Sequence, residues 1–414
     1  MERAFVALLL LASVAPAAEP FDSKSPDFKA LCQNTPSALD CAVLANNLGN
    51  VYFDRGKYRE AELLFTRAIS LWSTQTAPSD DLAKAFHNLA AAYHAEGQNA
   101  DAARFDLRAL DLRESLAGPR DLSLLPILNE LGMVYLEMAD YVQAEKTLQR
   151  AIAIVEAHQA EKTPDGADAM NSLALAYHEL GRLADSEALY RRALALYRQM
   201  SDPVREVAAL NNLGRLLANQ TRYEEAEQLY REAIGIAKQE LKPSDPDLAV
   251  GFSNLGKLMI ARRKFAHAEP LLRHAEEIDR HSFRPDDPRI GYDLCNEAAA
   301  AVGRKHYTEA EALYKKSEAI LEGALPPNHP EIGKVIYGLA NVYRFENRSD
   351  ESKPLFERAI TILEQAWGPE SPKLIAVLQS YEALLRERQQ YAEAEAVQVR
   401  STKIRVVEAL RPAN

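Results

Sequence analysis

The stretch "LANNLGNVYFDRGKYREAE", residues 44–62, decides the fold, because it returns near the middle of the chain as "LNNLGRLLANQTRYEEAE", residues 210–227. Apolar and small side chains follow helical three-and-four spacing in two segments interrupted at Gly56: Leu48, Tyr52, Ala61, Phe65 and Ala68. This pattern predicts a helix, a tight turn and a second helix. Both copies place two asparagines inside the first helix, although asparagine is a mediocre helix former.

The same unit repeats along the chain. The residue that closes the first helix, just before the "EAE" stretch, recurs every 40–42 residues at Tyr58, Asn99, Tyr141, Leu183, Tyr223, Phe265, Tyr307, Ser349 and Tyr391. One helical hairpin cannot bury its own apolar face, so successive hairpins must stack on one another. The sequence has no sustained alternation and no Asn-Gly hairpin turn, so it gives no strand signal. We therefore predict an all-α protein with about nine stacked units.

The loops between hairpins mark where each unit begins. Asp245, Asp287 and Ser371 each precede a proline, and an N-cap residue followed by proline is typical of a helix start. We expect one array over residues 42–414, with units at about 42–82, 83–124, 125–166, 167–206, 207–248, 249–290, 291–332, 333–374 and 375–414. Asp106 and Glu297 stand where other units have apolar residues, which predicts looser packing in the second and seventh units.

The first twenty residues, "MERAFVALLLLASVAPAAEP", have the composition of a secretory signal. Arg3 precedes an apolar run about half as long as a membrane-spanning helix, and Ala15-Pro16-Ala17 fits the cleavage rule. We predict a signal peptide over 1–17, an N-terminal segment over 18–41, and a secreted or periplasmic mature protein without a stable membrane span. The alternative is a short buried helix.

The chain has three cysteines. Cys32 and Cys41 are candidates for a disulfide in an oxidising compartment, and two buried free thiols are the alternative. Cys295 has no evident partner, so we expect it to line the core or a groove.

The pattern "LxNLGxxYxxxGxYxEAExLYxRAI" resembles tetratricopeptide repeats (TPR). The 42-residue period and the "DPD", "DDP" and "NHP" loops look like the longer repeats of the kinesin light chain type. The resemblance covers about nine tenths of the chain. It implies an α-solenoid with a right-handed superhelix, in which the first helices line a concave groove that holds peptides in extended form. Kinesin light chains are cytosolic, so the predicted signal peptide argues against motor transport.

The resemblance assigns groove positions in the first helices. The second Asn of the opening motif corresponds to Asn47, Asn88, Asn212, Asn254 and Asn296, and the position before it holds Asn46, Asn129, Asn171 and Asn211. Three residues after the second Asn come Asn50, Arg215, Lys257 and Asn341, and three further on come His94, His178, Arg344 and Arg386.

Two interpretations of the asparagines stay open. A side-chain amide offers a donor and an acceptor that match the backbone of an extended peptide. Alternatively, the amides bond the neighbouring unit and fix the stacking. Seven of the nine units keep an Asn at these two positions, which favours groove contacts. Arg215, Lys257, Arg344 and Arg386 map to the second half of the groove and would suit acidic groups, unless they form an ordinary solvated face.

Other classes of function have little support. A net charge of −11 argues against a nucleic-acid partner. His267, His274 and His281 are spaced seven residues apart, about 10 Å on a helix, which is too far to share one metal. "HELGR" at 178–182 has Arg182 where a zinc protease needs its second histidine. We therefore predict no catalytic residues, no metal and no cofactor.

These observations predict an exported scaffold that binds a protein or peptide partner in its groove and performs no catalysis. One alternative is a ligand-responsive sensor that changes the shape of its superhelix. The other is a structural assembly subunit that uses its convex face.

Overall fold

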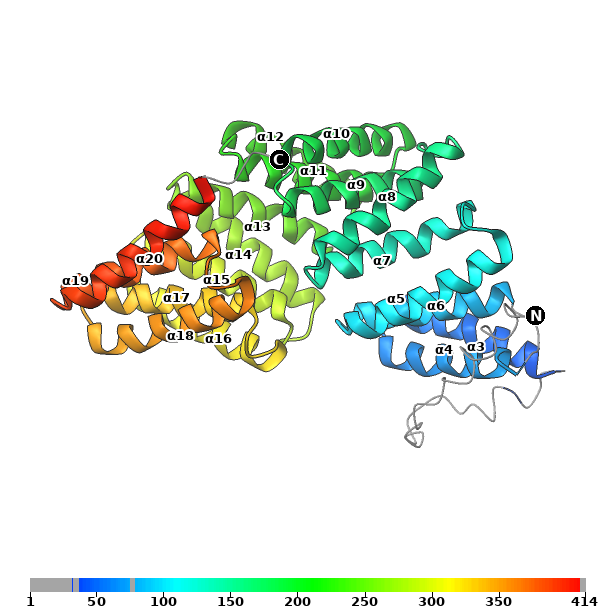
Figure 1. The fold of residues 1–414 in the computed structure, drawn as a ribbon, viewed down its shortest axis with the longest axis horizontal. Coiled ribbons are helices and arrows are strands. Elements are labelled where there is room, and N and C mark those ends of the chain that lie inside the picture. Colours follow the sequence, from blue (N-terminus) through cyan, green and yellow to red (C-terminus); the bar gives the residue numbers. More distant parts are fainter. Residues whose placement is uncertain (1–31, 33–36, 75–78, 410–414) are drawn as a thin grey trace. The chain divides into compact units, whose positions relative to one another are not determined.

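The computed structural model describes residues 32, 37–74 and 79–409, which contain eighteen α-helices and two short 3₁₀ helices (Figure 1). The predicted all-α fold of stacked helix pairs is confirmed. The predicted signal peptide and all of the N-terminal segment before Ser37 except Cys32 lie outside the described residues. Within them, no helix is both long and apolar enough to cross a membrane.

The helices alternate between first and second members of each pair. The first helices are α3 (Ala38–Phe53), α5 (Asp80–Ala95), α7 (Leu125–Glu137), α9 (Pro164–Glu179), α11 (Pro203–Asn219), α13 (Pro246–Ala261), α15 (Pro288–Gly303), α17 (Pro330–Phe345) and α19 (Ile375–Glu387). The second helices are α4 (Tyr58–Trp72), α6 (Asn99–Ala117), α8 (Tyr141–Ala157), α10 (Leu183–Met200), α12 (Tyr223–Glu240), α14 (Phe265–Ser282), α16 (Tyr307–Ala324), α18 (Ser349–Trp367) and α20 (Tyr391–Ala409). The residue that recurs every 40–42 positions is therefore the first residue of each second helix. The sequence analysis placed it at the end of the first helix, and this prediction was wrong.

The predicted starts of the first helices follow from their caps. The side chains of Asp245 and Asp287 accept hydrogen bonds from backbone N–H groups of the first turn, and proline occupies the first helical position. Ser371 also caps, but the turn that it opens is the 3₁₀ helix η2 (Pro372–Leu374), and α19 follows directly. The helix η1 (Leu122–Leu124) precedes α7 in the same way.

The turn between the two helices of a pair does not require glycine. Gly56, Gly97 and Gly181 have positive φ, two residues before the start of the second helix. The same position in the other six pairs also has positive φ and holds Ala139, Thr221, Arg263, Lys305, Asn347 and Gln389. Packing of the two helices therefore imposes the left-handed conformation even on residues that disfavour it.

The two helices of a pair approach closely where the first carries a small residue. A Cβ on Gly214 would lie 2.7 Å from the ring of Tyr230, a side chain that is 2% exposed. The chain divides into two compact parts, Met1–Leu196 and Tyr197–Asn414. In each part, the core lies between the first helices and the bulky side chains of the second helices.

Candidate functional site

The first helices form the inner side of each part. Successive first helices touch from α3 through α9 in the first part, and from α11 through α19 in the second. Among the described residues, the backbones of the second helices α4, α6 and α8 do not come together, nor do those of α12, α14, α16, α18 and α20. Only long side chains bridge them, as in the ion pairs Arg150–Glu114 and Arg358–Glu318. Closer spacing on one side curves a stack toward that side. We call the accessible surface of the first helices the inner face.

Several predicted groove asparagines bind neighbouring repeats. The Asn88 Nδ2 donates to the Asn46 Oδ1 at 3.1 Å, which joins α5 to α3. The Asn129 amide donates to the backbone carbonyl of Asp165 in the next repeat at 2.9 Å. The Asn296 amide donates to the Ser253 hydroxyl at 3.3 Å. For these asparagines, the structure favours the stacking interpretation over a direct role in holding a guest.

Other members of the predicted set are also engaged. The Asn341 amide donates to the carbonyl of Tyr337 within its own helix at 3.1 Å. Asn211 is only 5% exposed, and its Oδ1 has no hydrogen-bond partner in the described part of the chain. Asn171, Asn212 and Arg215 each have a polar or electrostatic partner.

Four predicted groove residues remain open toward solvent. Asn47, Asn50 and Lys257 are exposed, and Asn254 is half-buried on α13, one turn before Lys257. These side chains make no hydrogen bond or ion pair with another described residue. The surrounding protein, and then the positive charge of Arg215, lower the pKa of Lys257.

Fewer of the predicted groove cations are available to a partner than the sequence indicates. The Arg344 guanidinium donates to both carboxylate oxygens of Glu387, at 2.8–3.0 Å. Arg386 binds Glu382 and Gln398. Lys257, with Arg215 near it, is therefore the predicted cation most available to a partner.

His94 of the second repeat is hydrogen-bonded to two acids. His94 Nδ1 lies 2.6 Å from Glu130, and its Nε2 lies 3.0 Å from Glu137. These hydrogen bonds raise the pKa of His94 to about 10, so the ring is charged at neutral pH. One positive charge therefore lies between two carboxylates, and the cluster keeps a net negative charge.

The Asn46–Asn88 bond gives a direct test of the stacking role. We expect Asn46→Ala and Asn88→Ala each to lower the free energy of unfolding. The two losses should not add, and a double-mutant cycle should give a coupling energy of roughly 0.5–1.5 kcal/mol. Urea unfolding of the wild type, both single variants and the double variant measures this coupling. Strict additivity of the two changes would contradict the role of the bond.

A recurring arginine also joins neighbouring repeats. Arg182 binds Glu145 at 2.8 Å, and in the second part three further arginines bind the second helix of the preceding repeat: Arg262–Glu227, Arg304–Glu269 and Arg348–Glu311. Arg388 binds Asp350 in the same way. Sequence analysis missed this set, although each of these arginines stands one or three residues before a second helix in the repeat alignment.

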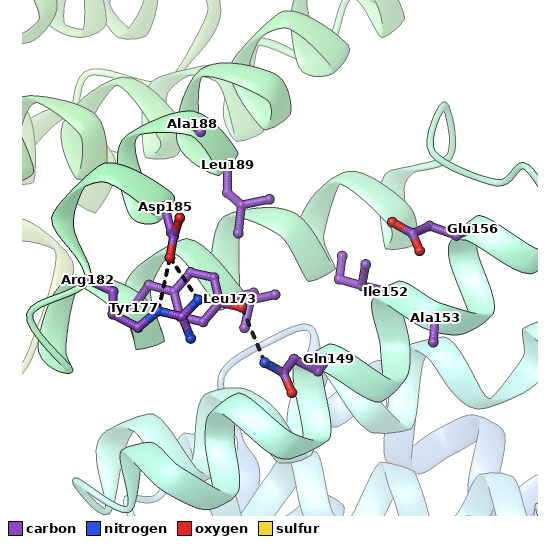
Figure 2. Close-up of a pocket in the computed structure, with 10 residues that line it drawn as sticks. All are labelled: Gln149, Ile152, Ala153, Glu156, Leu173, Tyr177, Arg182, Asp185, Ala188 and Leu189. Atoms are coloured by element: carbon purple, nitrogen blue, oxygen red, sulfur yellow. Dashed lines mark hydrogen bonds and ion pairs between the residues drawn. The ribbon is translucent and has the colours of Figure 1, made fainter. Parts of the chain in front are cut away.

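A pocket of about 410 Å³ lies beside Arg182 in the first part (Figure 2). The Arg182 guanidinium lies 3.8 Å from the centre of the Tyr177 ring and binds Asp185 at 2.7 Å. Gln149 donates to the Tyr177 hydroxyl at 3.3 Å, as Figure 2 shows. Gln149 thus joins α8 to α9, and Arg182 binds Asp185 on α10, so these polar groups of the pocket already have partners within the protein.

The cysteines and histidines do not form a reactive centre in the described residues. Cys32 and Cys41 are joined as a disulfide with Cα atoms 5.3 Å apart. Cys295 is half-buried, and burial raises the pKa of its thiol to about 12, which disfavours the nucleophilic thiolate. Within the described ranges, no cluster of three or more His, Cys, Asp or Glu side chains could hold a metal ion.

Comparison with known families identifies the class. The tetratricopeptide repeat family matches residues 40–115, 81–157, 123–199, 205–281 and 294–365. The chain belongs to the tetratricopeptide repeat family. Repeats of this class are in general binding modules rather than enzymes, and the fold implies a protein or peptide partner. No curated protein sequence gives a significant match.

Two solved structures show the same fold over most of this chain at low sequence identity. A Rap protein complexed with Competence and Sporulation Factor is 14% identical, with a TM-score of 0.62 over 89% of this chain and 98% of that one. The apo quorum sensor NprR from B. thuringiensis is 14% identical, with a TM-score of 0.61 over 90% and 99%. The kinesin light chain repeats of Podosopora anserina are 20% identical, with a TM-score of 0.41 over 48% and 96%.

Proposed function

We propose that the protein binds an extended protein or peptide segment along the inner face of its second part and has no reaction of its own. The observation that carries this proposal is the pair Asn254 and Lys257 on α13. Both are accessible, and neither is bound to another described residue, whereas Asn296, Asn341 and Arg344 already have partners. An open amide and an open cation can be bound by a guest without breaking a contact that holds the array.

The chemistry of these two side chains specifies the guest. The Asn254 amide can donate to a backbone carbonyl and accept from a backbone N–H, whatever the side chains of the peptide are. The Lys257 ammonium adds a preference for a carboxylate one turn further along α13. We therefore expect an extended segment that carries Asp or Glu beside an otherwise variable backbone.

Selection from a library of random displayed peptides tests the proposal. We expect enrichment of acidic residues, and we expect a bound peptide to slow hydrogen exchange in α11, α13 and α15. Protection confined to the second helices α12, α14 and α16 would instead place the partner on the opposite surface, and would refute binding at the inner face.

A ligand-responsive sensor is the second candidate. Two structural matches that span most of this chain are a Rap protein complexed with Competence and Sporulation Factor and the quorum sensor NprR, which favours this candidate. Small-angle scattering with and without a selected peptide distinguishes the two. A sensor changes its radius of gyration on binding, whereas a static scaffold does not.

We also propose that the protein is exported. The apolar run after Arg3 and the disulfide between Cys32 and Cys41 support a secretory route and an oxidising compartment. Mass spectrometry of the mature chain from its source cell tests this proposal, and we expect the chain to begin at Ala18. A chain that retains Met1 and two free thiols would contradict it.

A further inference from the structure

Two buried carboxyl groups meet between α14 and α15. Asp279 on α14 is 7% exposed, and Asp293 on α15 is 5% exposed. The two side chains lie close enough that each shifts the pKa of the other. The Asp279 Oδ1 and the Asp293 Oδ2 have no further partner in the described residues, and neither does the Oε1 of Glu297 one turn later.

The acid pair is specific to this joint. Counterparts of Asp293 in the other first helices are Leu44, Ala85, Ile127, Ala169, Ala209, Gly251, Val335 and Val377. Counterparts of Asp279 in the other second helices are Trp72, Arg113, Val155, Tyr197, Ala237, Leu321, Leu363 and Arg405. Stacking of the repeats therefore does not require a carboxyl at either position.

The groups around the Asp279–Asp293 pair carry both positive and negative charges, so they offset the negative charge of the ionised pair only in part. The charge of Lys257 on α13 lowers the pKa of Asp293 without an ion pair, and the charge of Glu297 on α15 raises it. Asp279 is near Arg289 and Asp287, at the start of α15, and Glu276 on its own helix. From α16, Ser317 and Leu321 face α15 without charge. On α17, Glu331 and Lys334 act on Lys257.

Two carboxylates in such a site cannot both ionise without repulsion, so the closed joint retains a proton. We propose that the Asp279–Asp293 pair is a proton-operated joint that holds α14 against α15 while protonated and loosens when both groups ionise. Asn296 on α15 and Lys257 on α13 flank it, so loosening would move one inner-face residue relative to the other. That last consequence rests on the proposed function, whereas the joint itself does not.

The direction of the pH dependence follows from the pKa values. Burial, and then the neighbouring charge, raises the pKa of Asp293 to about 8, and burial raises the pKa of Asp279 to about 6. Both lie above the ordinary value of an unfolded aspartate, which is about 3.9. The stabilisation is therefore complete below about pH 4 and is lost as the pH rises through about 6 to 8.

Hydrogen exchange of the protein without any partner tests the joint. Rates in α14 and α15 between pH 5.5 and 8.5 are corrected for intrinsic exchange and compared with those at the α16–α17 joint, where Leu321 and Val335 occupy the equivalent positions. We expect protection of α14 and α15 to fall at least about tenfold relative to α16–α17, because one pKa unit corresponds to a tenfold change in equilibrium.

Asp293→Ala, the residue found in three other repeats, should remove this pH dependence, and Asp293→Asn provides a second variant of nearly the same shape. Equal pH dependence in the wild type and both variants would overturn the proposal, and so would constant protection in the wild type. Because no peptide is present, failure to select a binding peptide leaves this result intact.

Discussion

Phe356→Ala should lower the free energy of unfolding by about 3–5 kcal/mol, as large aromatic truncations in packed cores do. Phe356 on α18 is 0% exposed, and its ring centre lies 6.1 Å from that of Tyr337 and 5.7 Å from that of Tyr381. The side chain thus packs against its own first helix and the first helix of the next repeat. Its loss leaves a cavity that rigid neighbours on both sides cannot fill.

Gln398→Ala is the matched control, because Gln398 occupies the same position in the last described repeat, where no other described repeat covers it. Its side chain is exposed and accepts a hydrogen bond from Arg386. We expect a change within about 0.5 kcal/mol. Urea unfolding monitored by circular dichroism measures both variants. Comparable costs for the two changes would contradict the stacking described for this part.

His87→Ala should cost about 3 kcal/mol near neutral pH, because it removes the partner of a buried carboxyl. The Asp106 side chain is fully buried on α6, and its Oδ1 lies 2.8 Å from the His87 Nδ1 on α5. The double variant His87→Ala/Asp106→Leu should recover most of the loss, because leucine occupies the position of Asp106 in the next repeat, as Leu148. Failure of the double variant to recover stability would contradict this account.

The same pair gives a pH dependence with a defined sign. Burial opposes a charge on His87, but the hydrogen bond to Asp106 and its negative charge outweigh this and raise the pKa of His87. Burial raises the pKa of Asp106 to about 6. Because both folded pKa values exceed the unfolded ones, this contribution is complete below about pH 4 and declines as the pH rises through about 6 and then through the pKa of His87. Melting temperatures from pH 4 to 8 should show this slope in the wild type and not in His87→Ala/Asp106→Leu.

The sequence predicts the helix pairs because their signals are local. Apolar spacing, prolines after capping residues and a recurring period determine where helices begin, and the structure agrees at Asp245 and Asp287. The sequence does not predict which residue a polar core side chain binds. Asp106 and Glu297 stand out in the repeat alignment, but only the packed structure shows that His87 binds Asp106, or that Glu297 lies beside an acid pair.

The roles of the asparagines could not be separated from sequence for the same reason. Asn88 and Asn254 occupy the same register position, yet Asn88 binds Asn46, and Asn254 has no hydrogen-bond partner in the described chain. Which amide reaches its neighbour depends on the stagger of two helices about 42 residues apart. The two asparagines of the opening stretch also differ: Asn46 joins α3 to α5, whereas Asn47 is exposed to solvent.

The affinity of a selected acidic peptide for two charge-reversed variants tests the central claim most directly. Lys257→Glu changes the inner face, and Lys316→Glu makes the same change at an exposed lysine of the second helix α16. We predict that Lys257→Glu weakens binding at least about tenfold, roughly 1.4 kcal/mol, while Lys316→Glu leaves it unchanged. Unchanged affinity in Lys257→Glu, or an equal loss in both variants, would contradict binding at the inner face.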